Sequence, residues 1–502
     1  MRETLFSSGG RLPPDPPGEQ TDSGGRPPQT PQGNRLGRRV FPLVATIGLL
    51  IVGVYTTTWG PSMMGRTEWV LPYDLWGTLI AATRLAHLDF GGLYTSPTGL
   101  VSLPGAAVIL VPIAAVIEAA GLSLQIPGPH NLHPAVWLMA APYEIALCCV
   151  TLFAADALAE QLGVARWKRA LLSAASAGIL WNVSARWGHP EDAVAVGLLL
   201  YAILAQSRSR AGLAGWLAGA AVCVQPLVLL ALPVMLALMP WRRMPMFLVR
   251  AALPSAVLLG AALVANWHAA YTSVTSQPNS PTVNHPTAWT SLAPHVANGN
   301  VAAGPARLAT IVLACCCALA VRRRWLARLD AARHGEAQPD RDPLAGTVGE
   351  RITVGGAVAD RAATTETAVG YGVKTAADAT TATGALVGRV WWPTPVLAEV
   401  LWWAAFTLAL RSFFEPVMVS YYPWPPLAVA LIPAATLSWG RLIAAGLVAG
   451  GVTAAAQGTS HSAWIWWAPL VAGLVLTLAL AAPGRLLPGH IRQSRRRSLA
   501  ST

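Results

Sequence analysis

The sequence predicts an all-α membrane protein, a polytopic bundle of roughly 11–14 transmembrane helices. Of its 502 residues, 54% are hydrophobic and only 12% are charged, whereas a soluble domain carries about 25% charged residues. Basic residues gather in short clusters between apolar runs, which is the pattern of cytoplasmic loops, so the net charge of +12 does not indicate a nucleic-acid surface. All six cysteines lie inside apolar runs, which favours neither a disulfide framework nor a zinc site.

The bundle is expected to form from apolar segments, several of which are shorter than the ~20 residues that a perpendicular spanning helix needs. Proline is frequent inside them, and kinked helices are tolerated where neighbouring helices satisfy the freed backbone groups. The candidate spans lie near residues 40–58, 101–120, 135–155, 170–186, 191–206, 211–225, 226–240, 250–267, 306–321, 391–411, 417–437, 441–457 and 463–482.

Orientation follows from the basic residues that flank the spans. Arg35, Arg38 and Arg39 precede the first span and place the start of the chain in the cytoplasm. That span lacks a cleavage-like end and is expected to be a retained anchor. From Arg166 onward each basic cluster falls on the inner side. If all three segments before Arg166 cross, however, Arg166 lies outside, so either the second or third is re-entrant or a crossing is missed. We expect an even number of crossings with both termini inside.

Composition divides the chain into five parts. Segments rich in Pro, Gly, Ser, Thr and charged residues lack the apolar content for a core, whereas the parts between them are strongly apolar. We expect a disordered cytoplasmic tail at 1–38, an N-terminal transmembrane module of catalytic type at 39–322, a disordered cytoplasmic linker at 323–390, C-terminal transmembrane helices at 391–484 and a basic cytoplasmic tail at 485–502.

Acidic residues at the outer face are the first candidates for chemistry, because carboxylates are costly near hydrocarbon and those at span ends are functional candidates by default. A solvated loop acid is the alternative for any one of them. Removing the acids of the tail, the linker, the inner loops and the span interiors leaves Glu68, Asp74, Asp89, Glu191, Asp192 and Glu415.

Asp74 lies in the segment that follows the first span. Trp59, Trp69, Tyr73 and Trp76 surround it, and a short amphipathic run from Leu75 to Leu88 follows it. An acid held at the membrane surface among aromatic rings suits chemistry on a sugar or lipid head group. Partial desolvation there is expected to raise its proton affinity. Asp89 comes after the amphipathic run and before two glycines, which favours a role in capping a turn.

A second polar group occupies a tight hairpin between two predicted spans. Arg186, His189, Glu191 and Asp192 lie within seven residues, and glycine and proline mark the turn. Acids at the start of the following helix favour its positive end, which is an alternative explanation for them. A histidine with two carboxylates can instead hold a divalent cation or donate to a phosphate.

The third group follows the span at 391–411. Arg411 ends that span at the outer face, where a guanidinium can bind a phosphate in bidentate fashion. Tyr421, Tyr422 and Trp424 either form an aromatic belt at the interface or stack on a sugar.

The order of these features resembles the GT-C superfamily of integral-membrane glycosyltransferases, in particular the bacterial mannosyl- and arabinosyltransferases that use polyprenyl-phosphate sugars. Asp74 and the run after it match that family's catalytic acid and amphipathic helix in the first outer loop. The Tyr/Pro-rich segment Leu93–Pro104 and the stretch from Ala154 to Pro233 follow the family's pattern, although Gln225 stands where many relatives have a basic residue. The resemblance covers residues 40–320 and, less closely, 391–440.

The resemblance implies an inverting transfer of a sugar, mannose or arabinose, from a polyprenyl-phosphate donor to a glycan or glycolipid acceptor. Asp74 is expected to be the general base, and Arg411, His189 or Arg186 are expected to stabilise the phosphate. Trp59, Trp187 and Trp289 are further candidates for sugar stacking. The expected location is the plasma membrane of a bacterium, with the site on the outer face and no nucleic-acid partner. Asp-X-Asp is absent from the first loop, which leaves metal use open, with Mg²⁺ or Mn²⁺ as the candidates. The substrate-binding candidates are Asp89, Arg186, His189, Glu191, Asp192, Arg411, Glu415, Tyr421, Tyr422, Trp76 and Trp289.

Two other classes of protein fit the composition. A multispan transporter or lipid flippase would use acids inside its helices, for which Glu118 and Glu144 are the candidates. A structural membrane protein would keep Asp74, His189 and Arg411 far apart. The outer segment 268–305 is expected to close over the site in the catalytic interpretation.

Overall fold

Helices make up the regular secondary structure of this protein, as the apolar segments predict. The computed structural model describes residues 39–59, 71–95, 100, 102–124, 134–276, 286–294, 304–336, 392–458 and 462–484. Within these ranges no β-strand forms, and the sheet-like pairing is an isolated bridge between Pro286 and Val417. The predicted all-α class is confirmed for this part of the chain.

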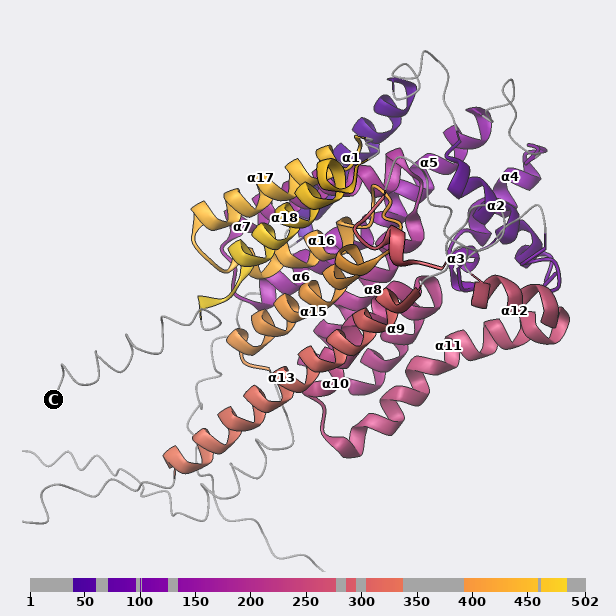
Figure 1. Ribbon diagram of the computed structural model, residues 1–502. Helices are drawn as coiled ribbons and strands as arrows, with labels where there is room; N and C mark the ends of the chain where they lie inside the picture. Colours follow the sequence, from indigo (N-terminus) through magenta and orange to yellow (C-terminus); the bar gives the residue numbers. More distant parts are fainter. Residues whose placement is uncertain are drawn as a thin grey trace, which may run out of the picture. The chain divides into compact units, whose positions relative to one another are not determined.

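Figure 1 labels the helices along the chain. In chain order they are α1 (Val40–Trp59), α2 (Tyr73–Ala86), α3 (Gly105–Val108), α4 (Val111–Ala119), α5 (Pro134–Cys148), α6 (Val150–Gln161), α7 (Arg166–Trp181), the π-helical turn η3 (Asn182–Arg186), α8 (Pro190–Ser207), α9 (Ala211–Val224), the 3₁₀ helix η4 (Pro226–Ala231), α10 (Leu232–Ala237), η5 (Trp241–Arg243), α11 (Met244–Ala265), α12 (Trp267–Ser276), η6 (Thr290–Leu292), α13 (Gly304–Glu336), α15 (Thr394–Phe414), α16 (Trp424–Ala435), α17 (Trp439–Ala455) and α18 (Ala463–Ala481).

Four helical segments in the described ranges are long and apolar enough to cross a membrane: Ala135–Gln161, Trp241–Ala265, Thr394–Phe414 and Trp464–Ala481. Shorter apolar helices of 10–17 residues accompany them at Val40–Thr56, Ala211–Val224, Pro226–Ala237, Trp424–Ala435 and Trp439–Ala455. By length and composition these helices support the predicted membrane character. The count of 11–14 crossings stays a prediction.

The segment 101–120, expected to be one span, is two short helices. Pro112 lacks an N–H group and so cannot donate to the carbonyl of Val108, which ends α3 before α4 begins. With nine residues, α4 is about 14 Å long, far shorter than a hydrocarbon core of about 30 Å. Both helices pack on α2 instead.

The long helix α13 extends into the segment that the sequence predicts to be a linker. It runs for 33 residues to Glu336, so residues 325–336 are helical although their sequence lacks strong periodicity. Arg324 and Arg328, one turn apart, both face Glu399 of α15, at 3.7 and 2.6 Å. These ion pairs with Glu399 explain why α13 continues past the apolar residues 306–321. The rest of the expected linker lies outside the described residues.

Helix α8 is buried along nearly its whole length and packs against α5, α6 and α9. Helices from the end of the chain complete the bundle, because α16 contacts α6, α7 and α8, and α15 contacts α13. In Figure 1, α13, α15 and α16 lie side by side beyond α8. The described residues from Phe41 onward thus belong to one compact unit.

Candidate functional site

The hairpin before α8 brings the first two site residues together. The π-helical turn η3 ends α7, Gly188 adopts a φ of +64°, and Pro190 opens α8. A Cβ atom at Gly188 would lie 2.9 Å from Pro72, so glycine permits the hairpin to approach the start of α2, where Asp74 lies in the first turn.

His189 joins two carboxylates at this point. Its Nε2 lies 3.0 Å from Oδ2 of Asp74, and its Nδ1 lies 2.7 Å from Oε1 of Glu191. Tyr421 covers the imidazole, with ring centroids 3.9 Å apart. A carboxylate accepts but does not donate, so both ring nitrogens donate and the ring is held as imidazolium.

The electrostatics of this group follow from these contacts. Burial alone lowers the pKa of His189, but the charge of Glu191 and the bonds to Asp74 and Glu191 outweigh it and raise that pKa well above its usual value. Burial raises the pKa of Asp74, but the hydrogen bond and charge of His189 outweigh it and lower that pKa. The expectation of a raised proton affinity at Asp74 is therefore wrong, because its neighbour is a cation and its side chain stays 47% exposed.

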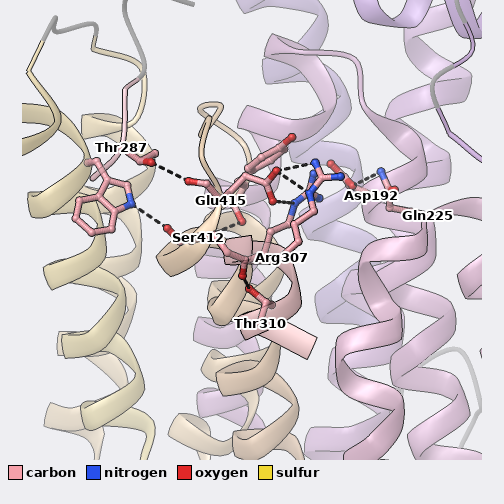
Figure 2. Close-up of polar contacts among 11 residues, drawn as sticks. Asp192, Gln225, Thr287, Arg307, Thr310, Ser412 and Glu415 are labelled. Carbon is pink, nitrogen blue, oxygen red and sulfur yellow. Dashed lines mark hydrogen bonds and ion pairs between the residues drawn. The ribbon is translucent and has the colours of Figure 1, made fainter. Parts of the chain in front are cut away.

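A second charged group forms around Glu415. The carboxylate of Glu415 lies between two guanidiniums: Arg307 donates to its Oε1 from Nη2 at 2.7 Å and from Nε at 3.1 Å, and Nε of Arg411 lies 3.7 Å from Oε2. The guanidinium of Arg411 stacks on Tyr422 at 3.7 Å from the ring centroid. Figure 2 shows Glu415 facing Arg307, with Asp192 and Gln225 nearby.

Both groups open on one cavity of about 400 Å³. The charged lining residues come from α8, α13, α15 and the segment after α15, while η4 supplies an apolar wall. The lining residues are Ser102, His189, Glu191, Gln225, Pro226, Leu227, Leu229, Leu230, Arg307, Thr310, Ile311, Arg411, Glu415, Tyr421 and Tyr422. Asp74 is not a lining residue, but it bonds to the lining residue His189. Asp74, His189 and Arg411 thus meet at one place, which a purely structural protein does not require.

Asp192 lies beside the lining residue Gln225. It is 3% exposed, and Nε2 of Gln225 donates to its Oδ1 at 2.8 Å. The side chain of Gln225, which replaces the basic residue of the resembled family, therefore bridges a buried acid and the cavity. Asp192 also lies in the first turn of α8, where an acid favours the positive end of the helix, so this alternative explanation stands beside its bond to Gln225 at the C-terminus of α9.

The described part of the outer segment contacts the cavity's edge. Thr287 donates to the carbonyl of Glu415 at 2.8 Å, Thr290 donates to that of Pro416 at 2.6 Å, and the indole of Trp289 donates to that of Phe413 at 2.6 Å. These bonds clamp the strand-like segment after α15 (Figure 2). None of the residues 286–294 lines the cavity, so closure over the site stays a prediction.

Three further sequence candidates are absent from the cavity lining. Trp76 is 3% exposed, and its indole donates to the carbonyl of Leu124. Residues two apart on a helix project about 200° apart, so Trp76 points away from the side of α2 on which Asp74 bonds to His189. Asp89 caps a turn by accepting from the N–H of Gly92 at 2.9 Å, at the far end of α2, which is about 20 Å long. Arg186 is half-buried and bonds to none of these groups.

Arg307 is the main site residue that the sequence interpretation missed. It begins the apolar part of α13 at the end opposite the basic cluster 322–324. A basic residue at that end departs from the positive-inside pattern, and this exception was the available signal.

Metal binding finds no support in the donor chemistry. The described ranges contain no group of three or more His, Cys, Asp or Glu side chains placed to hold an ion. His189 has both ring nitrogens engaged by carboxylates and offers no lone pair to a cation. Comparison with known proteins gives no further assignment, since neither protein-family models nor curated protein sequences match this chain.

Proposed function

We propose that this protein is a membrane glycosyltransferase that transfers a sugar, mannose or arabinose, from a polyprenyl-phosphate donor to a cell-envelope glycan or glycolipid. One observation carries the proposal: the histidine that holds a carboxylate deprotonated and a pair of guanidiniums line one cavity of about 400 Å³, and the carboxylate adjoins that cavity through its bond to the histidine. Such a transfer needs a carboxylate that takes the proton of the acceptor hydroxyl and cations that bind the phosphate of the donor.

The reaction divides between the two charged groups. Oδ1 or Oδ2 of Asp74 takes the proton from the acceptor hydroxyl as its oxygen attacks the anomeric carbon. The bond from that carbon to the phosphate oxygen breaks, and the electron pair leaves with the phosphate. Arg307 and Arg411 bind the growing negative charge, while His189 keeps Asp74 ionised and oriented.

The apolar wall supports a lipid-linked donor. Leu227, Leu229 and Leu230 line the cavity beside the charged groups, and Ile311 of α13 faces them. Leu229 is 49% exposed and Ile311 55% exposed, as expected for side chains that contact lipid. A prenyl chain entering between η4 and α13 places its phosphate at Arg307.

The helix pattern supports a site on the outer face of a bacterial plasma membrane. With 101–120 no longer a crossing, α1 leads outward and Ala135–Gln161 leads back, so Arg166 falls inside, as the positive-inside rule demands. Asp74 and the hairpin at His189 then share the outer side.

A transporter or lipid flippase is the second candidate, because one observation favours it. Glu144 of α5 is fully buried in an apolar segment and bonds to the thiol of Cys148, and its Oε2 has no hydrogen-bond partner. Buried acids at such depth often carry protons in carriers. Glu118 does not fit this role, since it is half-exposed and pairs with His87.

The test is sugar transfer by purified Asp74→Asn protein, with Asp89→Asn as the matched control. Loss of a general base typically costs about 10²- to 10⁴-fold in rate, so Asp74→Asn should lose nearly all transfer, whereas Asp89→Asn should lose little. Equal activity of both variants in a protein proven active would refute the assignment. Proton-coupled lipid movement that is lost in Glu144→Gln and kept in Asp74→Asn would establish the carrier instead.

A further inference from the structure

Arg250 is a cation inside the apolar helix α11, in its second turn. Its Cβ lies against Gly215 of α9, where an added Cβ would be 3.1 Å away, and its guanidinium lies where a Cβ at Gly212 would be. The side chain therefore runs one turn back along α9 to that helix's first turn, as an arginine does when it carries its charge toward the membrane surface. Glycine at position 212 leaves the space that the guanidinium occupies.

Arg243 brings a second guanidinium to the first turn of α9. Arg243, Phe247 and Arg250 follow one another at spacings of four and three residues, so they share one face of α11. That face packs on α9, because Phe247 is buried and a Cβ at Gly215 would lie 3.1 Å from its carbonyl oxygen. Arg243 also lines a pocket together with Ala211, the first residue of α9.

The described part of the protein does not neutralise these two charges. Neither guanidinium has an ion pair or a hydrogen bond to another described residue. The free N–H groups at the start of a helix add positive partial charge, so α9 begins with two cations beside its positive end. The buried acids on this side bond to other arginines, Asp156 to Arg169 and Glu399 to Arg328. An anion from outside the chain would offset this excess of positive charge.

The pocket beside Arg243 also contains an unpaired hydrogen-bond acceptor. Gln206 of α8 lines the pocket, and its Nε2 donates to the carbonyl of Met235 at 2.9 Å, so Oε1 is the remaining end of the amide. That oxygen is buried and has no hydrogen-bond partner among the described residues, which costs free energy. The pocket has a volume of about 30 Å³, which is room for one hydroxyl group.

The surface around the pocket is suited to a lipid. Helix α11 belongs to a segment that is long and apolar enough to cross a membrane, and little of it is buried. Met246 and Val249 of α11 and Leu213 of α9 are exposed apolar side chains against which acyl chains can pack. Trp241, just before α11, is 69% exposed, as expected for a ring at the membrane interface. The positive-inside pattern predicts that this interface is the cytoplasmic one.

We propose that the inner ends of α8, α9 and α11 bind an anionic phospholipid whose head group carries a hydroxyl, as in phosphatidylglycerol. The phosphate accepts hydrogen bonds from Arg243 and Arg250 at the start of α9, and the hydroxyl donates to Oε1 of Gln206. A choline head group fits less well, because its quaternary ammonium adds a third cation and has no proton to donate. The inference is independent of sugar transfer, since none of these residues lines the cavity at His189.

Native mass spectrometry of the full-length protein in detergent micelles gives dissociation constants for dioleoyl phosphatidylglycerol and dioleoyl phosphatidylcholine. Wild-type protein should bind the phosphatidylglycerol more tightly. Arg243→Gln and Arg250→Gln should each weaken that binding by about tenfold, because hydrogen bonds to a charged group contribute about this much. Arg242→Gln is the matched control: it removes the same charge from an exposed neighbour that does not line the pocket, so it should weaken binding by no more than about twofold.

Each constant comes from the midpoint of a saturation curve, so a partly unfolded sample lowers the amplitude and leaves the midpoint unchanged. Equal losses in Arg242→Gln and Arg243→Gln would indicate general attraction to basic residues and overturn the site. Wild-type protein that binds both lipids equally also overturns it. Glycerophosphoglycerol, the free head group, should compete weakly; binding as tight as that of the lipid would make the ligand a soluble phosphodiester and overturn the lipid assignment. Sugar transfer is tested separately, by Asp74→Asn.

Discussion

The ion pair between Arg307 and Glu415 should be asymmetric, so that losing the arginine costs more stability than neutralising the acid. In Arg307→Met the carboxylate of Glu415, 3% exposed, loses both hydrogen bonds from Arg307, while Nε of Arg411 stays at 3.7 Å. A buried charge that loses its partner costs about 3–5 kcal/mol, and the remaining contact places this case near 3 kcal/mol. In Glu415→Gln the guanidinium of Arg307, 31% exposed, can be hydrated, so the cost is about 1 kcal/mol.

The double variant should be about as stable as Arg307→Met or more so, since the buried carboxylate is neutralised and Arg411 keeps its stacking on Tyr422. A loss of about 2 kcal/mol for the double variant gives a coupling free energy of about 2 kcal/mol. Free energies of unfolding come from SDS titration of the protein in micelles, followed by tryptophan fluorescence. Arg324→Met is the control: it faces Glu399 at 3.7 Å, is 48% exposed, and leaves Arg328 at 2.6 Å, so it should cost less than about 0.5 kcal/mol. Two single losses that simply add, or a loss for Glu415→Gln as large as that for Arg307→Met, would refute this reasoning.

Three further outcomes are expected. His189→Gln removes the cation that lowers the pKa of Asp74 and leaves burial, which raises it; the acidic limb of the pH–rate profile should therefore move to higher pH, and an unmoved limb would separate His189 from Asp74. Deleting residues 275–295 removes the bonds of Thr287 to the cavity's edge and should abolish transfer without preventing membrane insertion; retained activity would make this segment a passive connector. Deleting 337–391 should leave transfer intact, whereas a deletion that begins at 323 also removes Arg328 and should lower stability; the two deletions are compared by transfer rate and by SDS titration.

Residue chemistry and topology together predicted the core of the site. Asp74, His189 and Arg411 lie 115 and 222 residues apart, yet the sequence predicts each to lie where an apolar segment meets the outer face. Helices that cross a bilayer must place their ends at one of two levels, so polar residues at these ends are confined to one layer. The sequence could not give their lateral arrangement, which depends on the packing of α16 against α7 and α8.

The failures have equally specific causes. Trp76 was grouped with Asp74 by proximity in sequence, but a helix points them in opposite directions. The span at 101–120 was predicted from hydropathy, which does not register the hydrogen bond that Pro112 removes. The proton affinity of Asp74 was predicted from its aromatic neighbours, whereas a histidine distant in sequence determines it. Arg307 was overlooked because it was judged by its apolar surroundings rather than by the end of the helix it occupies.

The residues around the cavity come from parts of the chain that are synthesised at different times. The wall with Arg411, Glu415 and Tyr422 comes from the last part of the chain, whereas Asp74 and His189 emerge from the ribosome much earlier. At about 5–20 residues per second, the roughly 200 residues between α8 and α15 take about 10–40 s to translate. For tens of seconds the nascent chain therefore contains Asp74 and His189 but not the C-terminal residues that complete the cavity lining. A polypeptide terminated before residue 394 would have the pair but lack Arg411 and Glu415, so translation that stops early would release a protein without the complete cavity lining.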